Sequence, residues 1–452
     1  MNLAEIVEAG LVEGGAAMVL AGHSRSVNCR LANNTVTTNG REESVSCGAV
    51  AIDSDQVGVQ AADVHAKEHV LRLARAARER AAASPKAPDA MPLMTPAEAA
   101  QPEVGAVTEL GEEEVSLEPI LDPLRRALEM SRRGGLQLYG FAEATEQVES
   151  LGTETGVRLT GQRRSGAVTL TLKTADLKRS VWAGAVGTEL AQIDVERLYS
   201  GLEQRLSWTD HQVQLDPGHY EVILEPSATA DMLLRLGWEM HARGADEERT
   251  VFAGQGRSRV GETMYAPHVT VESDPADPKM PVPGFVRSMA SSEYSSIFDN
   301  GLATGRTVWV DKGVQQELIC PRRWAKDHHH PVRPDCENLR LRGSDTPLEE
   351  MIASTKRALL IASLWYIRDV DPSTLLLTGL TRDGVFLIEN GKLVGAVNNF
   401  RFNESPVGVL QRTTEIGRTE MALSREIGAS VFVEAPPLRV DGFFMSSVSD
   451  AI

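Results

Sequence analysis

The stretch LLLTGLTRDGVFLIENGKLVGAVNNFRFNE, residues 375–404, decides the fold that we expect for this chain. Residues 385–388 form a short apolar run that favours a β-strand, and Asn390-Gly391 follows directly before another such run. Both turn residues tolerate positive φ, so the pattern predicts a tight hairpin. A further apolar run at 375–377 precedes more turn residues. We therefore expect three short strands in an antiparallel meander.

The chain before this stretch predicts a smaller region of helices and antiparallel strands. Residues 3–12 have helical spacing, strand patterns flank Asn39-Gly40, and an Ala- and Arg-rich helix follows Asp63. Prolines then mark a linker, and alternating apolar residues with glycine turns predict antiparallel sheet beyond it. The expected fold class is α+β, with a larger, mainly antiparallel C-terminal domain and a cleft between the regions. The expected divisions are residues 1–84, a linker at 85–103, a middle region at 104–215 and a C-terminal domain at 216–452.

Two cysteines flank the turn expected at Asn39-Gly40. If the hairpin turns there, Cys29 and Cys47 lie on opposite faces of one sheet, which disfavours a disulfide between them. We therefore expect both to remain reduced thiols.

Composition excludes several classes of function. The net charge of −17 argues against a nucleic-acid partner, because phosphate binding depends on clustered Lys and Arg. No apolar stretch approaches the roughly 18 residues that cross a bilayer, so no membrane partner is expected. The start of the chain has two early glutamates and no basic region, and cysteines are few, which predicts a reduced, cytoplasmic location.

Residues 364–392, LWYIRDVDPSTLLLTGLTRDGVFLIENGK, and the preceding NLRLRGSDTPLEEMIASTKRALL at 338–360 resemble the C-terminal region of the TldD/PmbA family. The resemblance extends to residues 2–83 and, more loosely, through the middle of the chain. It implies a peptide-cleaving metalloprotease built from two related subunits, TldD and TldE (PmbA), of which TldD carries zinc. Which subunit this chain resembles is therefore the functional question.

The zinc subunit of this family carries HExxxH on a helix of the C-terminal domain and a cysteine near its C-terminus. The corresponding helix here reads DMLLRLGWEMHARGADE, residues 231–247, and places Arg235, Leu236 and Met240 at the motif positions. Glu239 and His241 are the nearby candidates, and together they cannot close a tetrahedral zinc site. The C-terminal residues contain no cysteine. The resemblance thus implies a TldE-like subunit with no catalytic or metal residues of its own, whose TldD-like partner supplies zinc for cleaving unfolded peptides.

Two other histidine groups leave alternatives open. His65 and His69 match the H-x-x-E-H order of inverted zincins, although no third ligand follows at a recognisable spacing. The loop CPRRWAKDHHHPVRPDC, residues 320–336, could bind a metal or an acidic peptide end, or could be an exposed polar loop. A self-sufficient metallopeptidase using such ligands is one alternative. A peptide-binding or regulatory protein without enzymatic activity is another, since relatives bear the name "modulator of gyrase".

Polar side chains alternate around the end of the opening stretch. This alternation suits a solvated edge strand or a strand that pairs with a peptide backbone. We expect this stretch to line the cleft or the subunit interface, with the three consecutive histidines as further candidates. The expected peptide- or partner-binding residues are Arg382, Asn399, Arg401, Asn403, His328, His329 and His330.

Overall fold

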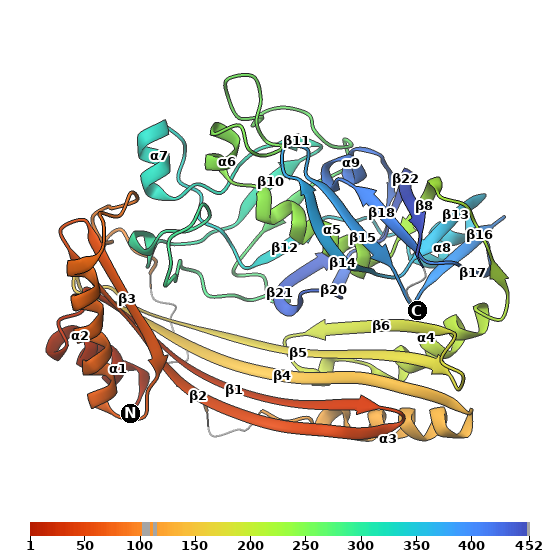
Figure 1. Ribbon diagram of the computed structural model, residues 1–452, viewed down its shortest axis with the longest axis horizontal. Helices are drawn as coiled ribbons and strands as arrows, with labels where there is room; N and C mark the ends of the chain where they lie inside the picture. Colours follow the sequence, from red (N-terminus) through yellow and green to blue (C-terminus); the bar gives the residue numbers. More distant parts are fainter. Residues whose placement is uncertain (102–108, 112–114, 450–452) are drawn as a thin grey trace.

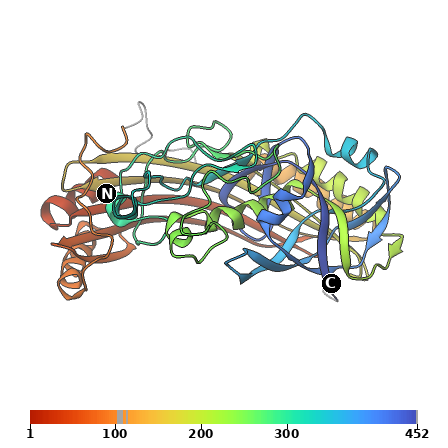
Figure 2. The same ribbon diagram turned by 90° about the horizontal axis from the view of Figure 1, so that it is seen from above.

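The structure is a computed structural model that describes residues 1–101, 109–111 and 115–449. Positions 102–103 of the expected linker and an acidic run at 112–114 lie outside the described residues. The predicted α+β class is confirmed. A long antiparallel sheet with helices at its ends lies against a larger, strand-rich C-terminal domain (Figure 1), and the sheet runs along the long axis of the molecule (Figure 2). No helix among the described residues is long and apolar enough to cross a membrane.

The N-terminal sheet contains strands from both sides of the expected linker. Its order is β3-β2-β1-β4-β5-β6, and all neighbours are antiparallel. Residues 1–84 and 104–215 therefore contribute to one sheet, because β1 pairs with β4 along nearly its whole length. Met94 and Ala99 of the linker are buried against this sheet. The strands are β1 (Met18–Ala32), β2 (Thr35–Asp53), β3 (Gln56–Asp63), β4 (Leu136–Thr153), β5 (Arg158–Thr174) and β6 (Ser180–Gly187).

The first hairpin turns at Asn33-Asn34 and not at Asn39-Gly40, so the predicted register is wrong. Both asparagines have positive φ, 49° and 61°, which this residue type tolerates. Cys29 of β1 pairs with Asn39 of β2, whereas Cys47 of β2 pairs with Ala21, which lies eight residues before Cys29 on β1. The two cysteines therefore share one face, contrary to the prediction. Both are free and buried, and a separation of roughly 25 Å along the strand excludes a disulfide between them.

Helices cover the two ends of the N-terminal sheet. The buried face of α2 (Lys67–Ala83) consists mainly of small residues, Val70 with three alanines. Small side chains let the helix approach β3 so closely that a Cβ at Gly58 would overlap the helix backbone. The other elements are α1 (Leu3–Glu8), a π-helical turn η1 (Ala9–Glu13), α3 (Glu118–Arg133), a 3-10 turn η2 (Leu190–Gln192) and α4 (Val195–Trp208).

The C-terminal domain contains two mixed sheets. The larger has the order β14-β15-β18-β22-β8-β13-β16-β17-β7, with β19 on β22, and the smaller has the order β11-β10-β9-β12-β21-β20. The larger sheet comprises β7 (Gln212–Val213), β8 (Gly218–Leu224), β13 (Arg357–Ile361), β14 (Leu364–Asp371), β15 (Leu376–Thr381), β16 (Val385–Glu389), β17 (Lys392–Val397), β18 (Phe400–Glu404), β19 (Thr413–Ile416) and β22 (Leu438–Val448). The smaller comprises β9 (Val271–Ser273), β10 (Thr307–Asp311), β11 (Val314–Gln315), β12 (Asn338–Leu341), β20 (Glu420–Ser424) and β21 (Gly428–Ala435).

Short helices connect these strands, and one longer helix packs between the sheets. That helix, α5 (Pro226–Glu239), is buried along most of its length and contacts strands of both sheets. The remaining elements are α6 (Ala242–Asp246), a 3-10 turn η3 (Ile297–Asp299), α7 (Arg322–His328), α8 (Leu348–Ala353) and α9 (Pro406–Gln411).

The opening stretch forms the predicted hairpin but not the predicted meander. β16 and β17 pair across Asn390-Gly391, whose φ values are 50° and 77°. β15 does not pair with β16, because it lies between β14 and β18 while β16 pairs with β13. The meander prediction is therefore wrong. Asn390-Gly391 marked a strand end correctly, whereas Thr378-Gly379, which we expected to follow a strand as turn residues, lie inside β15. The partners of β15 are the preceding strand β14 and the later strand β18.

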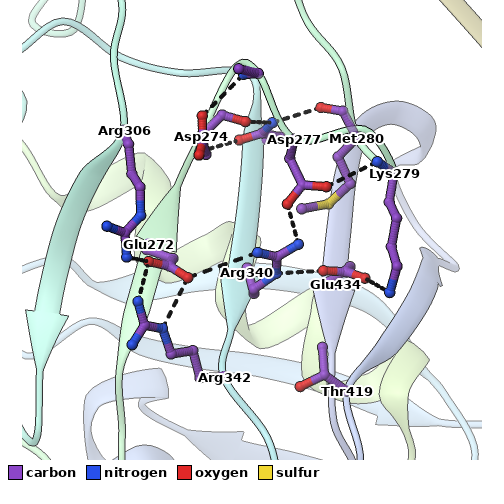
Figure 3. A network of polar contacts seen from close by, with 12 residues as sticks. Glu272, Asp274, Asp277, Lys279, Met280, Arg306, Arg340, Arg342, Thr419 and Glu434 are labelled. Carbon is purple, nitrogen blue, oxygen red and sulfur yellow. Dashed lines mark hydrogen bonds and ion pairs between the residues drawn. The ribbon is translucent and has the colours of Figure 1, made fainter.

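A network of buried charges crosses the smaller sheet (Figure 3). Glu272 of β9 accepts from Arg306 and Arg342 at 2.6 and 2.7 Å. Arg340 of β12 pairs with both Asp277 and Glu434, and Lys279 lies 3.1 Å from Glu434. The three carboxylate side chains are at most 8% exposed. Removing one cation would leave a buried carboxylate without its partner, so the loss of any of these ion pairs is expected to destabilise the sheet. Its members are Glu272, Asp277, Lys279, Arg306, Arg340, Arg342 and Glu434.

Candidate functional site

The end of α5 is the candidate functional site, because the expected HExxxH positions lie there. Arg235 occupies the first position, with a side chain that is 14% exposed. Its guanidinium donates to the Ile367 carbonyl at 3.1 Å and to the Glu426 carboxylate at 3.2 Å, and it lies 5.0 Å from the Trp238 ring. Arginine remains protonated and has no lone pair for a metal. This position therefore carries a fixed cation where a zinc ligand would be needed.

The other two motif positions are apolar. Leu236 is fully buried in the core of the C-terminal domain, so no general base stands there. Met240 ends the helix and is also buried, with its Sδ 3.8 Å from the Gln315 amide nitrogen. A thioether is a soft ligand that zinc sites seldom use. The zinc ion that the family resemblance implies does not fit these three side chains.

His241 is buried one residue beyond Met240 and has both ring nitrogens engaged. Nδ1 accepts from the Gly244 backbone N–H at 3.0 Å, which caps α6. That bond leaves the proton on Nε2, which lies 3.2 Å from the Glu293 carboxylate. Burial lowers the pKa of His241, and the charge of Glu293 opposes this effect. The imidazole thus fixes the start of α6 and has no free nitrogen for a metal.

Acidic groups surround His241, and two of them, Glu293 and Glu247, are paired with Arg249. Glu293 also accepts a hydrogen bond from Arg249, which binds Glu247 at 2.6 Å as well. Glu239 lies 4.0 Å from His241 Nε2, and its pKa is raised by burial and then by the charges of neighbouring carboxylates. Within the described ranges, no three His, Cys, Asp or Glu side chains are grouped so that they could hold a metal. At the helix end, His241, Glu293, Arg249 and Glu247 are thus linked by ion pairs, and Glu239 lies beside them.

The three consecutive histidines point to different partners. His328 stacks on Trp324, with ring centroids 3.8 Å apart, and His329 is exposed with a φ of 59° at the end of α7. His330 Nε2 lies 2.8 Å from the Asp246 carboxylate, which also accepts from the Trp324 indole. The structure does not bring the three imidazoles together. Of the three, His330 links the end of α7 to Asp246 of α6, His328 packs on its own helix and His329 faces solvent.

His65 and His69 do not share a helix face. α2 begins at Lys67 with Ala66 as its N-cap, so His65 precedes the helix. The two rings lie edge to face with centroids 6.0 Å apart. The helix that we expected directly after Asp63 begins three residues later, so the spacing that suggested an inverted zincin is not realised in helical geometry.

The polar residues of the opening stretch are spread over several surroundings. Asn399 lines a pocket of about 390 Å³ with Lys178 and Arg179, whereas Asn403 lines a separate pocket of about 480 Å³ beside Arg412. Arg401 donates to the Thr378 hydroxyl at 3.2 Å. β18 is paired on both sides, by β15 and β22. The edge-strand interpretation is therefore wrong, and a peptide backbone cannot add to this strand.

Arg382 lies at the turn between β15 and β16, next to a junction between the two regions of the chain. Asp383 binds Arg425 and accepts from Ser180 of the N-terminal sheet. The Arg425 guanidinium also lies 5.1 Å from the Trp182 ring and 5.5 Å from the Trp365 ring. Sequence reasoning missed this junction, because its partners are separated by up to about 245 residues and only the run Arg382-Asp383-Gly384 hinted at it.

Comparison with known proteins supports the same family. The family model described as PmbA/TldA metallopeptidase C-terminal domain matches residues 217–447. A comparison with curated proteins finds no match. Among solved structures, TldE from Thermococcus kodakarensis aligns with a TM-score of 0.80 at 15% identity, covering 98% of this chain and 99% of that one.

Two further solved structures share the fold at equally low identity. A putative modulator of a DNA gyrase from Thermotoga maritima has a TM-score of 0.76 at 15% identity, covering 98% of this chain and 99% of that one. A putative modulator of DNA gyrase from Bacteroides thetaiotaomicron has a TM-score of 0.74 at 15% identity, covering 99% and 98%. Since the family model spans just over half of the residues and the fold agrees throughout, the chain belongs to the TldD/PmbA family of metallopeptidase-like proteins.

Proposed function

We propose that this chain is the TldE-like subunit of a heteromeric zinc metallopeptidase that acts on unfolded peptides. The observation that carries the proposal is the end of α5, where Arg235, Leu236 and Met240 stand at the positions of HExxxH. In this proposal the TldD-like partner supplies zinc and the catalytic glutamate. This chain supplies the subunit interface, a wall of the cleft and control of access, and it works in the cytoplasm.

Arg235 gives a physical reason why this chain does not bind the metal itself. Its guanidinium is held by Glu426, and Glu426 in turn accepts from the Ile367 backbone N–H at 3.1 Å and from Arg368 at 3.0 Å. A divalent cation beside this guanidinium would meet like-charge repulsion in a partly desolvated place. These contacts support the proposal that a fixed positive charge stands where the partner subunit would hold its metal.

The polar residues near β18 and the histidines of α7 are our candidates for contacts with the partner or the peptide. Because β18 is already paired on both sides, such contacts would come from side chains and not from strand addition. The candidates are Arg382, Asn399, Arg401, Asn403, His328, His329 and His330.

Co-expression with an HExxxH-bearing TldD-like paralogue tests the proposal. We expect the two chains to co-elute in size-exclusion chromatography and to cleave an unfolded peptide only together. Replacing the glutamate of the partner's HExxxH should abolish cleavage. In this chain, H241N keeps an acceptor that can cap α6 and should leave activity unchanged.

Two outcomes would contradict the proposal. Cleavage by this chain alone would assign the chemistry to it, and loss of cleavage in a folded H241N complex would give its histidine a catalytic role. A non-enzymatic regulatory protein would instead bind peptides without cleavage in either preparation.

A further inference from the structure

A groove of about 1040 Å³ lies between α4 and β6 on one side and α8, β13 and β20 of the C-terminal domain on the other. In Figure 1, α4 and β6 lie next to the C-terminal domain. The groove includes residues at the start of α5, whereas the helix end described above lies roughly 20 Å away along the axis. It is therefore separate from the candidate functional site.

Glu225 lines this groove at the step from β8 into α5. The residue is 7% exposed, and its Oε2 accepts from the Arg205 guanidinium at 2.7 Å. Its Oε1 is buried and has no hydrogen-bond partner within the described part of the protein. A buried oxygen without a donor costs about 1–3 kcal/mol, and more when it is charged. A ligand that brings an N–H donor would remove this cost.

The groove combines further carboxylates with apolar walls. The carboxylates in its lining outnumber the cations by one: Asp194, Glu225, Glu349 and Glu420 stand against Arg197, Arg205 and Lys392. Burial raises the pKa of Glu420, and the charge of Glu225 adds to this rise, so the carboxylates act on one another. An arrangement of this kind favours a positively charged donor attached to an apolar chain. The apolar side chains that line the groove are Trp182, Leu198, Trp208, Leu348, Ile352, Leu393 and Met421.

Gly201 lies in the middle of α4 and also lines the groove. A Cβ at this position would meet nothing within 4 Å, so no packing contact requires glycine there. Glycine inside a helix destabilises it by roughly 0.5–1 kcal/mol relative to alanine. The structure offers one use for this glycine, which is to leave room in the groove.

We propose that the groove binds a primary alkylammonium group, with the ammonium donating to Glu225 Oε1 and the alkyl chain lying along Trp182 and Trp208. Arg205 stays paired with the other carboxylate oxygen. A divalent cation fits less well, because the Arg205 guanidinium lies beside Glu225, and in the described part of the chain no three His, Cys, Asp or Glu side chains are grouped so that they could hold a metal. A lysine side chain of a peptide and a free alkylamine share this chemistry.

Isothermal titration calorimetry with hexylamine tests the site. We expect hexylamine to bind at least tenfold more tightly than hexanol, which has the same chain without the charge, and hexanoate not to bind. Nα-acetyl-lysine amide forms a second arm. Binding of both amines identifies a lysine side chain as the natural ligand, and binding of hexylamine alone identifies a small free amine.

Three variants separate binding from folding. E225Q removes the charge and should weaken hexylamine binding at least tenfold. E317Q is the matched control, since Glu317 lies outside the groove and pairs with Arg333 at the same 2.7 Å. G201F should fill the groove and abolish hexylamine binding. Its melting temperature should be no lower than that of the parent protein.

Equal affinity for hexylamine and hexanol would overturn the proposal. Unchanged hexylamine binding in G201F would overturn it as well, and this result does not depend on whether E225Q folds. Because the test uses this chain without a partner, its outcome is independent of the peptidase proposal.

Discussion

Replacing Arg340 with alanine should destabilise the smaller sheet of the C-terminal domain by about 3 kcal/mol. The guanidinium binds Asp277 and Glu434, whose side chains are 8% and 3% exposed. Charge-assisted hydrogen bonds to such groups contribute roughly 1.5–3 kcal/mol each. In R340A, Glu434 still has the Lys279 ammonium at 3.1 Å. Most of the lost stability therefore arises at Asp277, because Arg340 is the residue whose cation pairs with its Oδ2 among the described residues. The expected loss of stability is therefore near the lower end of the summed contribution of the two hydrogen-bonded ion pairs.

Hydrogen exchange followed by mass spectrometry measures this effect locally. Amides of β9, β12 and β21 should exchange faster in R340A than in the parent. A loss of about 3 kcal/mol raises the equilibrium constant for local opening roughly 150-fold, and the exchange rates should rise by the same factor. R357A is the control, because Arg357 and Glu389 are 62% and 43% exposed at 3.5 Å. An exposed pair of this kind contributes about 0–1 kcal/mol. An R340A effect no larger than that of R357A would refute the description of the network as a buried, coupled unit.

Three further predictions follow from single sites. Burial raises the pKa of Asp231 from 3.8 to about 7, so the folded state keeps this carboxyl protonated, and the free energy of unfolding should fall by up to about 4 kcal/mol as pH rises from about 4 to about 7. D231N should remove this fall in urea denaturation, and an unchanged pH profile in D231N would contradict the raised pKa of Asp231. G391A should cost at least about 1 kcal/mol, because φ is 77° and a Cβ would overlap a carbonyl of α8; equal melting temperatures would show that the hairpin relaxes without cost. The double variant R401A/N403A should weaken partner assembly or peptide capture by a few kcal/mol at most, and wild-type assembly and cleavage would remove these residues from the site.

Local signals in the sequence gave reliable results where the interaction itself is local. Asn390-Gly391 predicted the β16–β17 hairpin because both residues tolerate the positive φ that the turn requires. Asn39-Gly40 carried the same signal but lies inside β2, since the long pairing of β1 with both neighbours places the turn at Asn33-Asn34. A turn motif shows where a hairpin is allowed, and the extended pairing decides where it forms.

Long-range pairing explains what the sequence could not reveal. β15 precedes β16 closely in the chain, yet it pairs with the preceding strand β14 and with the later strand β18, and β16 pairs with β13. For the candidate site, the sequence identified Arg235 and His241 but not Glu426 and Glu293, which hold them from distant segments. Carboxylates are common on protein surfaces, so only the fold distinguishes these two.

The zinc content of this chain alone and in complex with its TldD-like partner tests most directly the claim that the partner, and not this chain, binds the zinc. Metal analysis of this chain purified alone should give well under one zinc per molecule, because the expected motif positions carry a guanidinium and two apolar side chains, and Glu239 with His241 cannot close a tetrahedral site. The complex with the HExxxH-bearing paralogue should hold about one zinc per pair, and a chelator should remove the zinc and the peptide cleavage together. Stoichiometric zinc on this chain alone, lost along with peptidase activity on chelation, would contradict the account.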